Sequence, residues 1–138
     1  MTERERRSRI LHVEDEDLNR ILLRAVLARA EDSRLRSAIL DEAPDLAQAR
    51  AVLDTQDVDL VLLDVRLPDG NGLDLVKEIK ARDPRRAVLV MSASVLPAER
   101  DEAMRAGSDA FVPKPYDNAE LLGTMARLLD VRGNDSTD

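Results

Sequence analysis

The sequence predicts an α/β fold in which helices cover both faces of a five-stranded parallel sheet. Short apolar segments alternate five times along the 138 residues with segments whose apolar residues recur at helical spacing. The apolar segments are nearly continuous, which is typical of strands buried on both faces. A chain of this length forms one domain with its own core.

The expected strands are short apolar stretches that end at polar or turn-forming residues. The third is unbroken from Leu60 to Leu63, stops at Asp64, and is followed by a loop from Pro68 to Gly72. The second is short and contains few β-branched residues. The five expected strands are residues 9–13, about 37–41, 58–63, 87–91 and 110–112.

The expected helices each carry an apolar face. Asp17 can cap the first, Pro44 and Pro97 open the second and fourth, and Gly107 ends the fourth. Residues 31–36 are expected to form a polar loop. The five expected helices are about 18–29, 44–53, 73–83, 97–106 and 117–129.

The predicted domain spans residues 9–130. It is expected to lie between an N-terminal tail of residues 1–8, whose arginines are interleaved with glutamates and solvated, and a disordered C-terminal tail of residues 131–138. On this division no sequence is left for an output domain.

Composition excludes several classes of function. The chain has no Cys and one His, which excludes disulfides and thiol catalysis and disfavours a histidine-based metal site. A net charge of -7 disfavours direct nucleic-acid binding. No segment has the apolar length of a membrane span or a signal peptide, so we expect a cytoplasmic protein without membrane contact.

Acidic residues follow two of the expected strands. In the flavodoxin-like strand order 2-1-3-4-5 of a doubly wound sheet, the first strand lies beside the third, so Glu14, Asp15 and Asp64 converge. Three neighbouring carboxylates repel one another unless a cation sits between them. Oxygen ligands of this kind favour Mg²⁺.

Two further strand ends supply groups suited to phosphoryl chemistry at Asp64. Lys114 offers a cation for the phosphoryl charge, and Ser92 offers a small hydroxyl. Taken singly, each residue has a structural alternative: Asp64 could be a turn-forming residue, Ser92 an ordinary strand-end hydroxyl and Lys114 a surface lysine. Their joint placement at strand ends favours a role in phosphoryl chemistry. His12, inside the first strand, is interpreted as a packed neutral imidazole.

At these residues the sequence resembles the response regulator receiver domain of two-component signalling. The resemblance covers about residues 9–130, and its specificity comes from four motifs in the right order at strand ends. The motifs are residues 10–16 (ILHVEDE), 63–68 (LDVRLP) with Gly72, 90–93 (VMSA) and 106–115 (AGSDAFVPKP).

The resemblance implies roles for the acidic cluster. Asp64 would be the phosphoacceptor, and Asp15 and Asp64 would bind Mg²⁺ together with the backbone carbonyl of Arg66. Glu14 would act on the metal through water. Arg66 and Ser94 occupy the two positions that tune dephosphorylation in the family, and a long cationic Arg66 over the phosphoryl group would obstruct attacking water, which predicts slow to moderate autodephosphorylation.

The resemblance also implies a switch. Ser92 matches the switch Ser/Thr, and Phe111 matches the rotameric aromatic that is more often Tyr, although Phe111 is most simply a core residue. Lys114 matches the family's lysine, and the family implies a cis peptide before Pro115. Phosphorylation would move Ser92 and Phe111 and change a protein-binding surface.

The implied function is transfer of a phosphoryl group to Asp64 from phosphohistidine on a histidine kinase or histidine phosphotransfer protein, followed by contact with a downstream protein target. The chain would catalyse only its own phosphorylation and dephosphorylation, either as a terminal signal or as a phosphorelay intermediate. The residues expected to face the kinase are Leu18, Asn19, Ile21, Leu22, Pro115 and Tyr116.

Two other functions fit a sheet of this type less well. A flavodoxin-like cofactor binder needs a glycine- or hydroxyl-rich phosphate cradle after the first strand, where this chain has acidic residues from Glu14 to Asp17. A metal-dependent phosphatase with an Asp nucleophile would be expected to carry a second acid two residues after Asp64, where this chain has Arg66.

Overall fold

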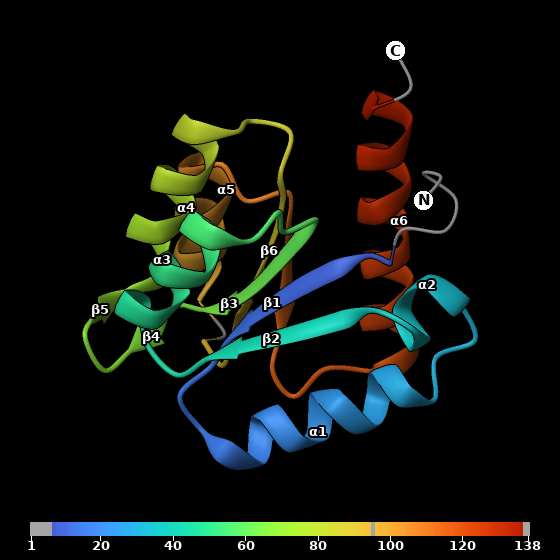
Figure 1. Ribbon diagram of the computed structural model, residues 1–138. Helices are drawn as coiled ribbons and strands as arrows, with labels where there is room; N and C mark the ends of the chain where they lie inside the picture. The colour runs from blue at the N-terminus through green and yellow to red at the C-terminus, as the bar shows by residue number, and fades with distance from the viewer. Residues whose placement is uncertain (1–6, 95, 137–138) are drawn as a thin grey trace.

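Five parallel strands form the central sheet of the computed structural model, which describes residues 7–94 and 96–136 (Figure 1). Their order is β2-β1-β3-β6-β7, which confirms the predicted 2-1-3-4-5 order because β4 and β5 belong to a separate ribbon. The strands are β1 (Arg9–Val13), β2 (Ile39–Ala43), β3 (Leu60–Asp64), β6 (Ala87–Ser92) and β7 (Ala110–Pro113).

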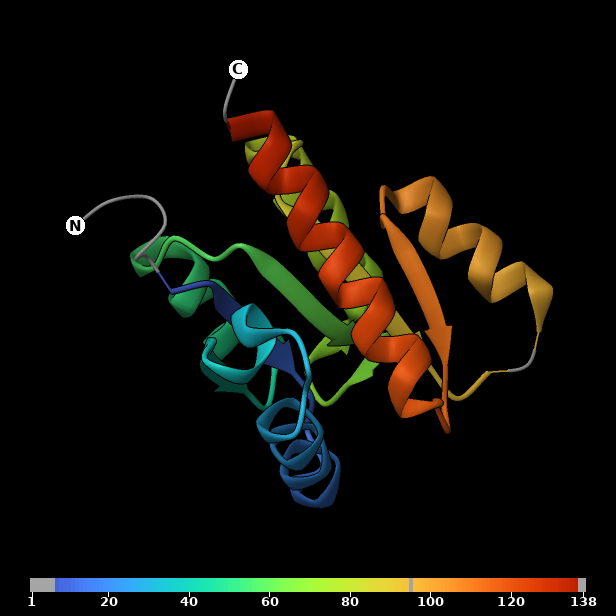
Figure 2. The same ribbon diagram turned by 90° about the vertical axis from the view of Figure 1, so that its right-hand side faces the viewer.

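Three helices cover each face of the sheet. One face carries α1 (Asp17–Ala28), α2 (Ser33–Arg36) and α6 (Asn118–Ser136). The other carries α3 (Leu46–Thr55), α4 (Gly72–Arg82) and α5 (Pro97–Ala106). Figures 1 and 2 show α6 running along one side of the sheet and the α3–α5 layer on the other.

The alternation of side chains along each strand divides the core into two clusters. Leu62 packs with α1 and α6, whereas its neighbour Leu63 packs with α3, α4 and α5. Both side chains are fully buried, and burial of a leucine of this kind contributes about 1.5–3 kcal/mol to stability. The strand that ends at Asp64 is therefore fixed from both faces.

A two-stranded antiparallel ribbon follows β3, in the predicted loop. It consists of β4 (Arg66–Leu67) and β5 (Gly70–Asn71), which are too short to give a periodic signal in the sequence. Between them, Asp69 accepts hydrogen bonds from the backbone amides of Leu46 and Ala47 at 2.9 and 3.0 Å. The ribbon is thereby tied to the start of α3.

The predicted loop at residues 31–36 is wrong in part, because it contains α2. Asp32 caps this helix by accepting a hydrogen bond from the Arg34 amide at 2.8 Å. Four residues are too few to show helical periodicity. Because Ser37 forms the C-cap of α2, β2 begins at Ile39 rather than at residue 37.

Two predicted helix starts also differ from the structure. Asp17 is the first residue of α1, where it pairs with Arg20, while the N-cap is Glu16, which makes no side-chain cap hydrogen bond. Pro44 precedes the start of α3, whose N-cap Asp45 accepts a hydrogen bond from Gln48 N at 2.8 Å. The side chain that accepts the amide hydrogen bond, and not the proline, sets this helix start.

The predicted end of α5 is confirmed. Pro97 is its first residue, and Gly107 ends it with a φ of 111°, a left-handed conformation that favours glycine. The predicted end of α6 near Leu129 is wrong, because the helix continues to Ser136 across most of the expected tail. The three residues after Leu129, which are Asp130, Val131 and Arg132, include neither Pro nor Gly, so the chain offers no stop signal at that point.

Two residues of the predicted N-terminal tail, Arg7 and Ser8, make hydrogen bonds to the rest of the chain. Residues 1–6, most of the predicted tail, lie outside the described residues, as do residues 137–138. Arg7 Nε donates a hydrogen bond to the Ser37 carbonyl at 2.7 Å, and the Ser8 carbonyl accepts one from Ile39 N at 2.8 Å. Arg9 pairs with Asp41 at 2.8 Å, so Ser8 and Arg9 contact β2 while Arg7 contacts the C-cap of α2.

None of the helices within residues 7–94 and 96–136 has the length and apolar character that crossing a membrane requires.

Candidate functional site

The carboxyl ends of four strands meet at one edge of the sheet. Glu14 and Asp15 follow β1, Asp64 ends β3, Ser92 ends β6, and Lys114 follows β7. The register of the parallel strands brings these ends level, since Asp64 lies opposite Met91 and Ser92 lies opposite Pro113. The five residues predicted to carry the phosphoryl and metal chemistry therefore lie at one edge of the sheet.

The three carboxylates form a cluster. One oxygen from each of Glu14, Asp15 and Asp64 lies within 4.8 Å of the others. Asp15 is exposed and Asp64 half-buried, whereas Glu14 is only 1% exposed. The donor set fits a hard divalent cation with few protein ligands, such as Mg²⁺.

Lys114 lies between two of these carboxylates. Its Nζ is 2.6 Å from Glu14 Oε1 and 3.1 Å from Asp64 Oδ2. Burial alone would lower the pKa of Lys114, but its hydrogen bond to Glu14 and the charges of Asp64 and Glu14 raise the pKa above its usual value. The ammonium group therefore stays charged next to Asp64.

The backbone around Lys114 also fixes its position. The peptide bond between Lys114 and Pro115 is cis, as the family resemblance implied. The Lys114 amide donates a hydrogen bond to the Ser92 carbonyl at 2.8 Å. Two of the predicted site residues are thus joined through their backbones.

Glu14 is held by several donors. Its carboxylate accepts hydrogen bonds from Asn19 Nδ2 at 3.2 Å and from the Glu16 amide at 3.3 Å. Burial would raise the pKa of Glu14, but the hydrogen bond and charge of Lys114, with the Glu16 amide, lower the pKa below its usual value. Arg20 donates to the Glu14 carbonyl oxygen. These contacts keep a buried carboxylate ionised.

Gly72 sets the backbone position of Asp64. A Cβ atom at Gly72 would overlap the Asp64 carbonyl oxygen and would come within 2.9 Å of Leu63 Cδ1. The Gly72 amide donates to the Val65 carbonyl at 2.6 Å. The first turn of α4 therefore packs directly against the backbone of the acidic residue, which explains why the motif after Asp64 contains this glycine.

Ser92 has a partner that the sequence analysis missed. Its hydroxyl donates to Oε1 of Glu99 in α5 and accepts from the Ser94 amide at 3.1 Å. The Ser94 hydroxyl accepts from the Leu96 amide at 3.2 Å. Glu99 gave no signal in the sequence, because an acidic residue in the first turn of a helix is common on electrostatic grounds alone.

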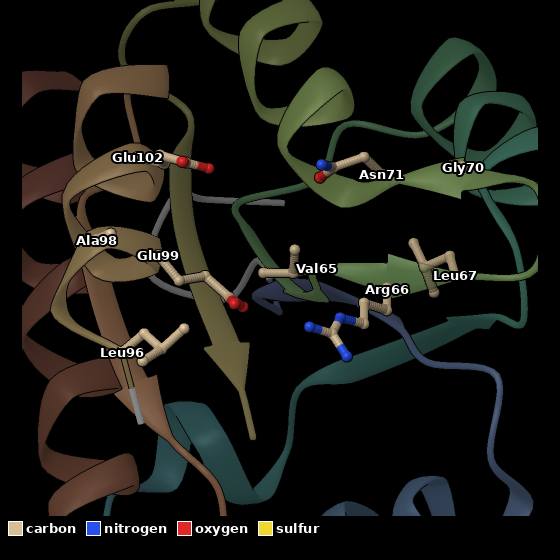
Figure 3. Close-up of a pocket in the computed structure, with 9 residues that line it drawn as sticks. All are labelled: Val65, Arg66, Leu67, Gly70, Asn71, Leu96, Ala98, Glu99 and Glu102. Carbon is tan, nitrogen blue, oxygen red and sulfur yellow. The ribbon is translucent and has the colours of Figure 1, made fainter. Parts of the chain in front are cut away.

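Arg66 and Glu99 face one another across an open pocket of about 420 Å³. In Figure 3 the Arg66 guanidinium points into this pocket toward the Glu99 carboxylate, with Val65 between them at the back. Arg66 is exposed. The pocket lies between the β4–β5 ribbon and the start of α5, beside the end of β3.

Phe111 lies in β7 opposite Val90 and is half-buried against the core cluster beneath α3, α4 and α5. It is thus partly a core residue, as its simplest interpretation predicted.

A second pocket, of about 250 Å³, lies on the α1 and α6 face. Four of the residues expected to contact a kinase line it, namely Asn19, Leu22, Pro115 and Tyr116. The other two, Leu18 and Ile21, are exposed on α1, with Leu18 64% accessible. Four of the six predicted contact residues therefore share a pocket with Lys114.

His12 lies at the wall of this second pocket and is 3% exposed. Burial lowers the pKa of His12 from 6.5 to about 4, so the imidazole is neutral at neutral pH, as predicted. Within the part of the chain that the structure describes, His12 Nδ1 is buried without a hydrogen-bond partner.

Sequence comparisons connect this arrangement to known proteins. The profile of the response regulator receiver domain family matches residues 10–126. Response regulator protein PilR from Pseudomonas aeruginosa is 35% identical over 133 residues, which are 96% of this chain and 28% of PilR. Aerobic respiration control sensor protein ArcB from Escherichia coli is 31% identical over 131 residues, 93% of this chain and 16% of ArcB. The chain therefore spans less than a third of these relatives.

Solved structures share the fold. The signal receiver domain of an HD domain-containing protein from Pseudomonas fluorescens superimposes with a TM-score of 0.84 at 25% identity, covering 94% of this chain and 99% of that one. A CheY-like response regulator receiver domain protein from Methanospirillum hungatei gives a TM-score of 0.83 at 21% identity, covering 94% and 99%. The profile match across most of the chain, with acids, serine and lysine gathered at the strand ends, shows that the chain belongs to the response regulator receiver domain family.

Proposed function

We propose that Asp64 accepts a phosphoryl group from phosphohistidine on a partner protein. The observation that carries the proposal is the position of Asp64, which lies half-buried beside two further carboxylates and 3.1 Å from the Lys114 ammonium group. A carboxylate held next to a fixed cation suits attack on a negatively charged phosphoryl group.

In the proposed step an Asp64 oxygen bonds to phosphorus as the bond from phosphorus to the donor's histidine nitrogen breaks. The product is an acyl phosphate on Asp64. Lys114 stays in place to neutralise an oxygen of the transferred group, and the burial of Glu14 keeps Lys114 oriented. Most of the protein's contribution is thus positioning and electrostatic stabilisation.

Mg²⁺ fits the acidic cluster in this function. Asp15, Asp64 and the backbone carbonyl of Arg66 would bind it, with Glu14 contributing through water, and it would supply further positive charge to the phosphoryl oxygens. The chain itself catalyses only its own phosphorylation and dephosphorylation.

The proposed output is a change of a protein-binding surface. Ser92 moves toward the phosphoryl group and Phe111, already half-buried in β7, turns further inward, which shifts the surface formed by α5, β7 and α6. The proposed donor, a histidine kinase or histidine phosphotransfer protein, binds the exposed apolar residues of α1 and the segment at Pro115 and Tyr116, next to Lys114. A downstream protein target reads the changed surface.

The test is intact mass after incubation with acetyl phosphate or phosphoramidate and Mg²⁺. We expect the parent to gain one phosphoryl group and the Asp64→Asn variant to gain none. Asp74→Asn is the matched control, because it removes the same charge from an exposed position in the first turn of α4. Failure of the folded parent to gain a phosphoryl group, or an equal gain in Asp64→Asn, would refute the proposal.

A further inference from the structure

We infer that Glu99 is a positioning residue that holds the Ser92 hydroxyl in the resting state and so sets how readily the site accepts a phosphoryl group. The inference rests on the proposed function, in which Ser92 contacts the phosphoryl group on Asp64. It concerns a residue of α5, outside the set of acids, serine and lysine at the strand ends.

The geometry of the Ser92 hydroxyl carries the inference. Ser92 is 4% exposed, and its Oγ donates to Glu99 Oε1 while accepting from the Ser94 amide at 3.1 Å. A serine hydroxyl has a single proton to donate. In the resting structure that proton is given to Glu99.

A phosphoryl oxygen would compete for the same proton. Phosphoryl oxygens accept hydrogen bonds, so Ser92 can bind one only as a donor and must first release Glu99. A hydrogen bond to a charged acceptor is about twice as strong as a neutral one, so the release has a cost. Glu99 therefore favours the resting state of the switch.

After Ser92 releases it, the Glu99 carboxylate still faces a positively charged side chain, that of Arg66. Figure 3 shows the Arg66 guanidinium facing Glu99 across the open pocket of about 420 Å³. Arg66 lies in β4, two residues beyond Asp64, so the pocket joins the segment that follows the phosphorylation site to the start of α5. Glu99 keeps a facing positive charge when Ser92 leaves it, which limits the cost of the exchange.

The experiment measures the affinity of the protein for beryllofluoride, a mimic of the phosphoryl group, in the presence of Mg²⁺ by NMR titration. We expect Glu99→Ala to bind it about ten- to a hundredfold more tightly than the parent, the range that loss of one hydrogen bond to a charged acceptor gives. Glu99→Gln keeps a side-chain oxygen that accepts the Ser92 proton, so its affinity is expected between those of the parent and Glu99→Ala.

Two comparisons separate positioning from charge. Glu102→Ala removes the same charge from the next turn of α5 on the same pocket and is expected to change the affinity little. In a Ser92→Ala background, Glu99→Ala is expected to have no effect, because Glu99 acts through the Ser92 hydroxyl. Urea unfolding of each variant checks that the fold is intact.

The outcomes separate this inference from the proposed function. If the parent accepts a phosphoryl group and binds beryllofluoride, but Glu99→Ala binds no more tightly than Glu102→Ala, the inference is wrong and the proposed function stands. The inference is equally wrong if Glu99→Ala keeps its full effect in the Ser92→Ala background. If the parent neither accepts a phosphoryl group nor binds beryllofluoride, the proposed function fails and the inference fails with it.

Discussion

The ammonium group of Lys114 lies 3.1 Å from Oδ2 of Asp64 and is also bound, at 2.6 Å, to the buried carboxylate of Glu14. Glu14 thereby fixes a cation beside an acid whose side chain is 20% exposed. The same cation offsets the repulsion among the three clustered carboxylates. Lys114 thus has a structural and a chemical role, and the two can be measured separately.

Replacing Lys114 with Met should slow phosphorylation while strengthening Mg²⁺ binding. Loss of the cation beside Asp64 is expected to lower the phosphorylation rate with phosphoramidate by at least about a hundredfold, as removal of one preorganised charge donor does in other sites. The carboxylates lose a competing positive charge, so the Mg²⁺ dissociation constant falls. Intact mass against time and a Mg²⁺ titration measure the two effects.

The matched control for Lys114→Met is Lys77→Met, on the exposed face of α4. It removes the same charge away from the acidic cluster and should leave both quantities unchanged. Weaker Mg²⁺ binding in Lys114→Met would contradict the view that the lysine and the metal share the carboxylates.

Alanine at Gly72 should destabilise the protein, whereas alanine at Gly123 should stabilise it. At Gly72 the new Cβ overlaps the Asp64 carbonyl oxygen, which is backbone and cannot move aside, so the free energy of unfolding is expected to fall by about 1–3 kcal/mol. At Gly123, an exposed position of α6, the Cβ meets nothing within 4 Å. There alanine is expected to add about 0.5–1 kcal/mol. Urea unfolding measures both changes, and equal stability of the two variants would be inconsistent with the close approach at Asp64.

His12 should make stability depend on pH in the mildly acidic range. Its pKa is 6.5 in the unfolded chain and about 4 in the fold because of burial, so between these values the unfolded state binds more protons. Stability is then complete above pH 6.5 and is lost as the pH falls toward 4, by about 3 kcal/mol in total. Replacing His12 with Leu removes this contribution.

The measurement is the free energy of unfolding in urea at several values between pH 7 and about 5. Groups that face His12, namely Glu14, Glu42, Lys114 and Arg20, are common to both proteins, so the difference between parent and variant isolates His12. Parallel curves for the two proteins would show that the imidazole titrates normally in the fold.

Removing the side chain of Arg66 should shorten the life of the phosphorylated form. Arg66 is exposed and stands two residues beyond Asp64, at the pocket that leads to the end of β3. If its side chain obstructs water at the phosphoryl group, Arg66→Ala loses the group faster than the parent. Arg66→Lys, which keeps a long cationic side chain, should remain close to the parent.

Loss of the phosphoryl group is followed by intact mass after removal of the small-molecule donor. A half-life in Arg66→Ala equal to or longer than that of the parent would exclude a shielding role.

The sequence by itself determined the alternation of strands and helices. With the flavodoxin-like strand order it also predicted that Asp64, Ser92, Lys114 and the two acids after β1 gather at one edge. This was possible because the carboxyl ends of parallel strands always share one edge of a sheet, so the order of the strands places their terminal residues. The burial of His12 followed in the same way, from its position inside a strand covered on both faces. Short elements escaped this reasoning, since neither α2 nor the β4–β5 ribbon is long enough to show a period.

Only the tertiary structure decided which partners the site residues take. The hydrogen bond from Ser92 to Glu99 joins a strand end to a different element, and the bond from Asn19 to Glu14 uses a side chain that the sequence assigned to partner contact. Such pairs depend on how the helices pack at the edge of the sheet. This packing sets the distances between the side chains, and residue spacing in the sequence does not predict them. The sequence predicted the groups that meet at the site, and the packing of α1 and α5 determined how each is held.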